Sequence, residues 1–94
     1  MHSDQIVRRS ERAVFRELAG EKGSVLLNLD SGAYHSLNAV GTLIWNLIGD
    51  GSTFGDLVDG VRSALTDAPA GLHGEVDSFV QDLLQRDLLT VPEE

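Results

Sequence analysis

The chain has no cysteine, only two prolines and only one tryptophan among its 94 residues. The absence of cysteine excludes disulfide bonds, thiolate catalysis and cysteine metal sites. No apolar run approaches the roughly 20 residues that a membrane span needs, and the N-terminal stretch Met-His-Ser-Asp-Gln lacks the apolar core of a signal peptide. We therefore expect a soluble cytoplasmic protein. An apolar fraction of 41% predicts one small folded domain.

Basic residues are also few, and they are unevenly distributed. Five of the seven lie before residue 23, whereas eleven of the fifteen acidic residues lie after it. An acidic surface repels phosphate, so this composition argues against nucleic-acid binding. Two interpretations of the charge stay open: a solvated surface that keeps the protein soluble, or a binding partner that carries basic residues.

The most distinctive stretch predicts a β-hairpin that leads directly into a helix. Residues 25–29 form an apolar run long enough for a strand and too short for a helix. The triplet Asp30-Ser31-Gly32 predicts a turn, because glycine adopts a positive φ without a Cβ clash. An alternating segment precedes this hairpin. The three predicted strands (12–18, 24–29 and 33–37) would form an antiparallel meander whose third strand is an edge.

Three helices are expected after the strands. Asn38 can cap the first, over 39–48, because its side-chain oxygen can accept from free backbone amides. Thr53 and Asp56 resemble a capping box at the second. Apolar residues recur at helical spacing in each helix: Val40, Leu43, Ile44, Leu47 and Ile48 in the first, Phe54, Leu57, Val58, Val61, Ala64 and Leu65 in the second, and Leu72, Val76, Phe79, Val80, Leu83 and Leu84 in the third.

This order of elements predicts an α+β fold of winged-helix character, a three-stranded antiparallel sheet followed by three helices. Residues 1–11 are expected to be a flexible N-terminal segment and 12–91 the single domain. The apolar stretch 88–91 predicts a final strand or an extended segment. Trp45, at the margin of the first helix's apolar stripe, is expected to lie in the core between that helix and the sheet.

The apolar residues of the third helix cover an arc of about 140°, wider than the roughly 100° that one core contact requires. One margin of this helix therefore faces something outside the domain, or the core is broad. The sequence favours neither interpretation.

No catalytic or metal site is evident. The three histidines (His2, His35 and His73) lack metal-ligand spacing, and the chain has no phosphate-binding loop or convincing Ser/His/Asp set. Ser31 has the Asp-Ser context of a carrier-protein serine, but its position in a turn favours an ordinary turn residue. We therefore expect no enzyme activity, no metal and no cofactor.

The residues of the predicted hairpin and first helix resemble a known family. The stretch 25–38 (Val-Leu-Leu-Asn-Leu-Asp-Ser-Gly-Ala-Tyr-His-Ser-Leu-Asn) resembles the PqqD-like recognition elements of ribosomally made, post-translationally modified peptides (RiPPs). The resemblance continues through Gly41, Ile44-Trp45, Gly49-Asp50-Gly51 and Thr53, and it covers residues 12–91. The Ile44-Trp45 pair and the Asp30-Ser31-Gly32 turn are more similar to the stand-alone B1 proteins of lasso-peptide biosynthesis than to the PQQ-pathway protein.

The resemblance implies a three-stranded sheet against three helices, and it implies binding of a precursor's leader segment. In the family the leader docks as an extra strand on the third strand, beside the third helix, and is presented to a separate leader peptidase (B2-type), with the cyclase as a further candidate partner. The peptide-binding residues that this implies here are Ala33, Tyr34, His35, Ser36 and Leu37 on the strand, and Val76, Phe79, Val80, Leu83 and Leu84 on the helix.

Strand addition is also physically reasonable for this chain. An edge strand exposes unpaired amides and carbonyls, but each backbone hydrogen bond contributes only about 0.5–1.5 kcal/mol and any sequence can supply it. Selectivity must therefore come from buried side chains of the ligand, at about 1.5–3 kcal/mol each. Other interpretations stay open: a PQQ-pathway or other RiPP chaperone, a winged-helix DNA-binding regulator, or a diverged carrier protein modified at Ser31.

Overall fold

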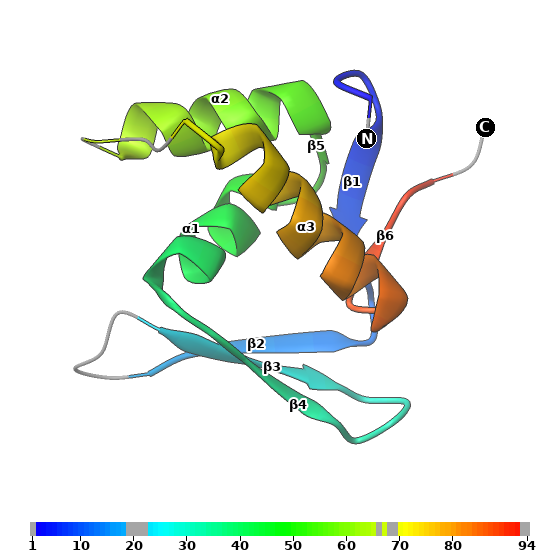
Figure 1. Ribbon diagram of the computed structural model, residues 1–94. Coiled ribbons are helices and arrows are strands. Elements are labelled where there is room, and N and C mark those ends of the chain that lie inside the picture. The colour runs from blue at the N-terminus through cyan, green and yellow to red at the C-terminus, as the bar shows by residue number, and fades with distance from the viewer. Residues whose placement is uncertain (1, 19–22, 66, 68–69, 93–94) are drawn as a thin grey trace.

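The strands of the computed structural model, which describes residues 2–18, 23–65, 67 and 70–92, form two small antiparallel sheets. One sheet has the order β2 (Ala13–Glu17), β3 (Ser24–Asn28), β4 (Tyr34–Leu37), and the other has the order β5 (Ser52–Thr53), β1 (Ile6–Arg9), β6 (Leu89–Thr90). The helices are α1 (Ala39–Ile48), α2 (Phe54–Ala64) and α3 (Leu72–Gln85). All three lie on the same side of the β2-β3-β4 sheet (Figure 1). No helix of the described chain is long and apolar enough to cross a membrane.

The meander predicted from the sequence is present as β2, β3 and β4, and the α+β fold is confirmed. β3 lies in the middle and pairs antiparallel with β2 over five residues and with β4 over four. β4 follows β3 directly and has β3 as its neighbour in the sheet order. The prediction that the third strand of the meander is an edge is therefore confirmed.

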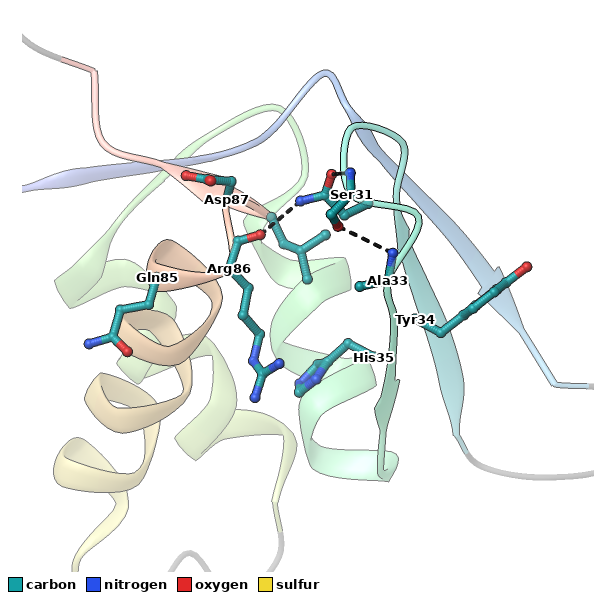
Figure 2. Close-up of a pocket in the computed structure, with 9 residues that line it drawn as sticks. Ser31, Ala33, Tyr34, His35, Gln85, Arg86 and Asp87 are labelled. Atoms are coloured by element: carbon teal, nitrogen blue, oxygen red, sulfur yellow. Dashed lines mark hydrogen bonds between the residues drawn. The ribbon is translucent and has the colours of Figure 1, made fainter.

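The turn between β3 and β4 forms through side chains of its own residues. Asn28 Oδ1 accepts from the backbone N–H groups of Asp30 and Ser31, at 2.8 and 3.2 Å. Gly32 has φ 74°, the left-handed conformation that glycine adopts without strain. The Ala33 N–H donates to Ser31 Oγ (Figure 2). Ser31 thus stabilises the turn, in agreement with the expectation of an ordinary turn residue.

The two faces of the β2-β3-β4 sheet have different surroundings, because successive residues of a strand point to opposite faces. Phe15, Leu26 and His35 lie directly opposite one another and form a row on the face toward the helices, where Leu26 is completely buried. The neighbouring row of Val14, Leu27 and Tyr34 faces away from the helices.

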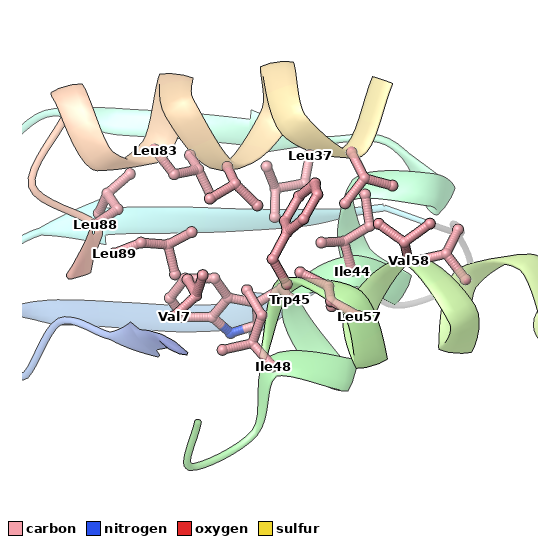
Figure 3. Packing of buried hydrophobic residues seen from close by; sticks show 14 of the residues in the cluster. Val7, Leu37, Ile44, Trp45, Ile48, Leu57, Val58, Leu83, Leu88 and Leu89 are labelled. Atoms are coloured by element: carbon pink, nitrogen blue, oxygen red, sulfur yellow. The ribbon is translucent and has the colours of Figure 1, made fainter. Parts of the chain in front are cut away.

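Trp45 connects α1 to this sheet inside the core. Its side chain is 1% exposed, and its ring stacks on Phe15 with a centroid distance of 5.9 Å and an interplanar angle of 17°. Aliphatic side chains from the helices and strands surround it (Figure 3). The prediction that Trp45 is a core residue between α1 and the sheet is confirmed.

Arg9 on β1 packs against Trp45. Its guanidinium carbon lies 4.9 Å from the centre of the Trp45 ring, and Nη2 donates to the Trp45 carbonyl oxygen at 2.7 Å. Burial lowers the pKa of Arg9, an effect that the nearby Asp50 opposes. An arginine stays charged at neutral pH in either case, so β1 adds a cation–π contact to the core.

β1 was not foreseen from the sequence, which predicts a flexible segment over 1–11. In the structure β1 is the central strand of the second sheet, with Ile6 and Val7 opposite β5 and Arg8 and Arg9 opposite β6. Val7 is completely buried. The two partner strands have only two residues each and are remote in sequence, so no local pattern indicates the pairing. β6 itself agrees with the prediction of a final strand within 88–91.

Candidate functional site

The free edge of β4 is the first component of a candidate site. In an antiparallel sheet, alternate residues of an edge strand direct their N–H and C=O groups away from the neighbouring strand. No further strand pairs with β4 within the described residues. This edge can therefore accept one more strand, whose backbone would satisfy these groups.

α3 lies beside this edge, and a polar contact connects the two. His35 Nε2 on β4 is 3.6 Å from Asp82 Oδ2 on α3, and Arg86 Nε donates to both carboxylate oxygens of Asp82 at 3.2 Å. His35 points from β4 toward α3, whereas Tyr34 points away from it (Figure 2). We call the space between β4 and α3, with His35, Asp82 and Phe79 along it, the β4–α3 groove.

One end of the β4–α3 groove is a polar hollow of about 240 Å³. It lies between the β3–β4 turn and the end of α3 (Figure 2), and it is lined by Asn28, Ser31, Ala33, Tyr34, His35, Gln85, Arg86, Asp87 and Leu88. Asn28 connects the two sides of this hollow. Its Nδ2 donates to the Arg86 carbonyl oxygen at 2.9 Å, and its Oδ1 accepts from the Asp30 N–H in the β3–β4 turn. The β3–β4 turn and the end of α3 are therefore connected across this hollow.

A second hollow of about 330 Å³ lies between α1 and α3 and is lined mostly by apolar residues: Asn38, Val40, Gly41, Ile44, Leu72, Glu75, Val76 and Phe79. Gly41 allows Phe79 to approach α1 closely. A Cβ at position 41 would lie 3.0 Å from Phe79 Cε1 and 3.3 Å from Leu37 Cβ. The absence of a side chain at Gly41 thus sets where the Phe79 ring lies in this hollow.

The structure distributes the ten residues implied by the resemblance over three environments. Val76, Val80 and Leu83 are completely buried in the core, and Leu37 is also buried. A broad core therefore explains most of the wide apolar arc of α3, one of the two interpretations left open by the sequence. A ligand on the surface reaches these side chains only at the edge of a hollow, as for Val76.

The remaining six residues are more accessible. His35 and Phe79 are partly buried and lie along the groove, and Ala33 lines the polar hollow. Tyr34 and Ser36 are exposed and belong to the opposite face of the sheet. Leu84 packs against the core and lines neither hollow.

On the third helix the sequence interpretation followed apolar residues only and therefore missed two polar residues, Asp82 and Arg86. Helical residues three or four apart share a face. Asp82 follows Phe79 by three residues and precedes Arg86 by four, so the three lie along one side of α3. This spacing, together with the histidine on the edge strand, is the sequence signal that could have indicated Asp82 and Arg86 as site residues.

Comparisons with known proteins agree with this geometry. A family model described as coenzyme PQQ synthesis protein D (PqqD) matches residues 23–89, which is most of the chain. The solved structure of TbiB1 in complex with the TbiA(beta) leader peptide has a similar fold, with a TM-score of 0.77 and 25% identity, and the match covers 93% of this chain and 99% of that one. No curated protein sequence matches. The resemblance seen in the hairpin and first helix is thus confirmed, and the chain belongs to the PqqD family.

Proposed function

We propose that this protein is a non-catalytic adaptor that binds the leader segment of a ribosomally made precursor peptide. The leader adds to β4 as a further strand and is held beside α3 for a separate leader peptidase. The observation that carries the proposal is the free edge of β4 beside α3, with a hollow between β4 and the end of α3. The likeness to TbiB1, which was solved with a leader peptide, supports it.

In strand addition, the backbone of the leader contributes affinity and its side chains contribute selectivity. The backbone of the leader pairs with β4, at about 0.5–1.5 kcal/mol for each hydrogen bond, whatever its sequence. Alternate side chains of the added strand point toward α3, where they meet His35, Asp82 and Phe79. These inward side chains select the peptide, since one buried aliphatic or aromatic group contributes about 1.5–3 kcal/mol.

The two hollows suit different side chains. The hollow beside Phe79, Val40 and Ile44 suits an aromatic, aliphatic or proline anchor. The hollow beside His35 and Arg86 suits a polar residue that can accept hydrogen bonds. A leader with one anchor of each kind fits best when the two anchors are two or four positions apart in sequence, because only alternate residues of the added strand point inward.

The precursor class that we propose is the lasso type, with a B2-type peptidase as the partner that removes the leader. The likeness to TbiB1 and the Ile44-Trp45 pair favour this class over the PQQ pathway. The runner-up is an adaptor of the same fold that serves another RiPP pathway, which would use the same β4 edge.

The test is a titration with the leader peptide of the precursor encoded beside this gene, made with one N-methylated backbone amide at a time. An N-methyl group removes a donor and blocks close strand pairing. We expect every second position along the docked stretch to lose at least about tenfold in affinity, and the intervening positions to change little. A loss without this two-residue period, or no binding of the unmodified leader, would contradict strand addition to β4.

A further inference from the structure

Two buried polar residues, Ser24 and Asn28, lie near the two ends of β3. Successive residues of a strand point to opposite faces, so both share the helix-facing side with the completely buried Leu26. They are the buried polar residues within the part of the chain that the structure describes. A buried polar side chain is costly unless it is hydrogen-bonded, so the partners of these two residues indicate what each one holds in place.

The Asn28 side chain contacts two segments that are far apart in the sequence. Its Oδ1 accepts from the backbone N–H groups of Asp30 and Ser31 in the β3–β4 turn. Its Nδ2 donates at 2.9 Å to the carbonyl oxygen of Arg86, which caps the C-terminal end of α3. The turn and the helix end are the two sides of the polar hollow, so a single amide group binds both sides.

The carbonyl group of Arg86 can accept this bond because of the way in which α3 ends. The last carbonyl groups of a helix have no partner within the helix itself. At the end of α3 the Leu88 N–H donates to the Leu83 carbonyl oxygen at 2.9 Å, and Asp87 has φ 58°, as in a Schellman motif. The carbonyl oxygen of Arg86 accepts from Asn28 instead. Asn28 thus caps α3 from another part of the fold.

The position of Arg86 matters for leader binding because its side chain lies in the β4–α3 groove. Arg86 Nε donates to both carboxylate oxygens of Asp82, and Asp82 lies 3.6 Å from His35 on β4. This ion pair also connects the two walls of the groove. The Asp82 side chain is 45% exposed, however, and exposed ion pairs contribute little. The buried amide of Asn28 is therefore the stronger polar link at this end of the groove.

Ser24 connects a different pair of elements. Its Oγ lies 2.8 Å from Thr42 Oγ1 on α1, and it is at the end of β3 away from the polar hollow. β3 is therefore tied to α1 at one end and to the end of α3 at the other. The tie through Asn28 is the one that joins the two sides of the polar hollow.

We propose that Asn28 is a positioning residue for leader binding, whose side-chain amide sets the separation between the β3–β4 turn and the end of α3. This inference rests on the proposed function. The separation determines whether an inward side chain of the leader fits between β4 and α3, and it places Arg86 beside that side chain. A shift of either wall lowers leader affinity even in a folded protein, because packing contacts and hydrogen bonds weaken steeply with distance.

The chemistry of the amide indicates which variants test this role. Asparagine offers an acceptor to the turn and a donor to the Arg86 carbonyl, whereas aspartate at neutral pH offers acceptors only. Asn28→Asp therefore keeps the bonds within the turn and places a carboxylate oxygen against that carbonyl. Asn28→Ser also keeps an acceptor for the turn, lacks the amide nitrogen that reaches α3, and adds no charge. Ser24→Ala is the matched control, because it removes a buried hydrogen bond from the same face of the same strand.

The leader of the precursor encoded beside this gene is titrated against the full chain and the three variants, and their melting temperatures are measured. We expect Asn28→Ser and Ser24→Ala to lower the melting temperature by several degrees each, because each loses a buried hydrogen bond. Both Asn28 variants should lower leader affinity by at least about tenfold, and Ser24→Ala should change it by less than about twofold. If the added charge unfolds Asn28→Asp, the comparison of Asn28→Ser with Ser24→Ala decides.

A second leader localises the effect to the polar hollow. It carries alanine at the inward position next to His35 and Arg86, and the wild type should bind it at least about tenfold more weakly than the natural leader. Asn28→Ser should cause little further loss with this leader, because the two changes act on the same contact.

A measurement without leader tests the separation itself. The chain has no cysteine, so Asp30→Cys and Gln85→Cys introduce two unique sites for spin labels, both at exposed positions. One label lies on the β3–β4 turn and the other at the end of α3. The distribution of distances between the labels should be broader or longer in Asn28→Ser than in the wild type, and it should stay unchanged in Ser24→Ala.

Four results would each overturn the inference: wild-type leader affinity in Asn28→Ser, an equal loss of affinity in Ser24→Ala, a full further loss by Asn28→Ser with the alanine leader, or an unchanged label distance. The first two would show that Asn28 contributes to stability alone. Failure of the wild type to bind the natural leader is a separate result, visible in the first titration, and it would contradict the proposed function itself.

Discussion

His35 on β4 and Asp82 on α3 face each other across the β4–α3 groove, with Nε2 and Oδ2 3.6 Å apart. Asp82 also holds Arg86, one helical turn further along α3. A leader strand on β4 must therefore pass a small charged cluster, in which one carboxylate faces an arginine and a histidine. The negative charge of Asp82 offsets the positive charge of Arg86. The extent of this offset determines how strongly the groove prefers a leader side chain that accepts hydrogen bonds.

The replacement Asp82→Asn tests this arrangement. The change should alter the free energy of unfolding by less than about 1 kcal/mol, because the carboxylate is 45% exposed and exposed ion pairs contribute little. It leaves Arg86 without its carboxylate, so a leader with Glu at the inward position should gain about three- to tenfold in affinity over the same leader with Gln. Calorimetric titration of the two peptides measures the difference.

Asp59→Asn is the control for this change, because Asp59 forms a comparable ion pair with Arg62 on α2, at 3.6 Å. It should leave the ratio of the Glu and Gln peptides as in the wild type. Equal gains for both peptides in Asp82→Asn would show that the cluster does not face the leader.

The close approach of Phe79 to α1 leads to a prediction for Gly41→Ala. The added Cβ would lie 3.0 Å from Phe79 Cε1, so the ring must move within the apolar hollow. We expect a loss of about tenfold in leader affinity with a change of at most about 1 kcal/mol in stability, since alanine favours the helix. Gly74→Ala on α3 is the control, because its Cβ would meet nothing within 4 Å; it should stabilise the protein by roughly 1 kcal/mol and leave leader binding intact.

Phe79 and Val80 are adjacent on α3 but should respond differently to substitution. Phe79→Ala removes a partly buried ring at the groove and should lower leader affinity by at least about tenfold in a protein that stays folded. Val80→Asp places a carboxylate without a partner in a completely buried position and should unfold the chain. Chemical denaturation and leader titration of both variants separate the two roles. A folded Val80→Asp protein with weak leader binding would contradict this assignment.

A fourth prediction concerns β1. Val7 is completely buried at the centre of the second sheet, whereas its neighbour Ile6 is largely exposed. Val7→Asp should therefore unfold the protein or cost several kcal/mol, and Ile6→Asp should cost little. Thermal unfolding followed by circular dichroism compares them. Similar melting temperatures for the two variants would mean that β1 does not contribute to the core.

Local signals account for the parts of the fold that the sequence predicted. Asn28 to Gly32 contains the turn chemistry within five residues, and Asn38 does cap α1, accepting from the Gly41 N–H at 2.8 Å. The edge position of β4 follows from the two short-range connections that join β2, β3 and β4 in sequence order. These features depend on neighbours in the chain, which a pattern in the sequence can show.

The parts that could not be predicted depend on distant residues. β1 pairs with β5 and β6, which lie more than forty and about eighty residues further along the chain. The burial of Val76, Val80 and Leu83 follows from contact with several elements at once, so helical spacing alone could not separate core from groove. Asp82 has a polar side chain, and its importance becomes visible only when β4 lies beside α3.

The position of β1 between β5 and β6 also has a consequence for synthesis on the ribosome. Arg9 lies opposite Leu89, so the second sheet closes only after β6 has left the exit tunnel. Until then the apolar side chain of Val7 stays in water, in a nascent chain whose hairpin and first helix are already available. Closure of the second sheet thus waits for the synthesis of β6, and loss of Leu89 and Thr90 should destabilise β1 as well.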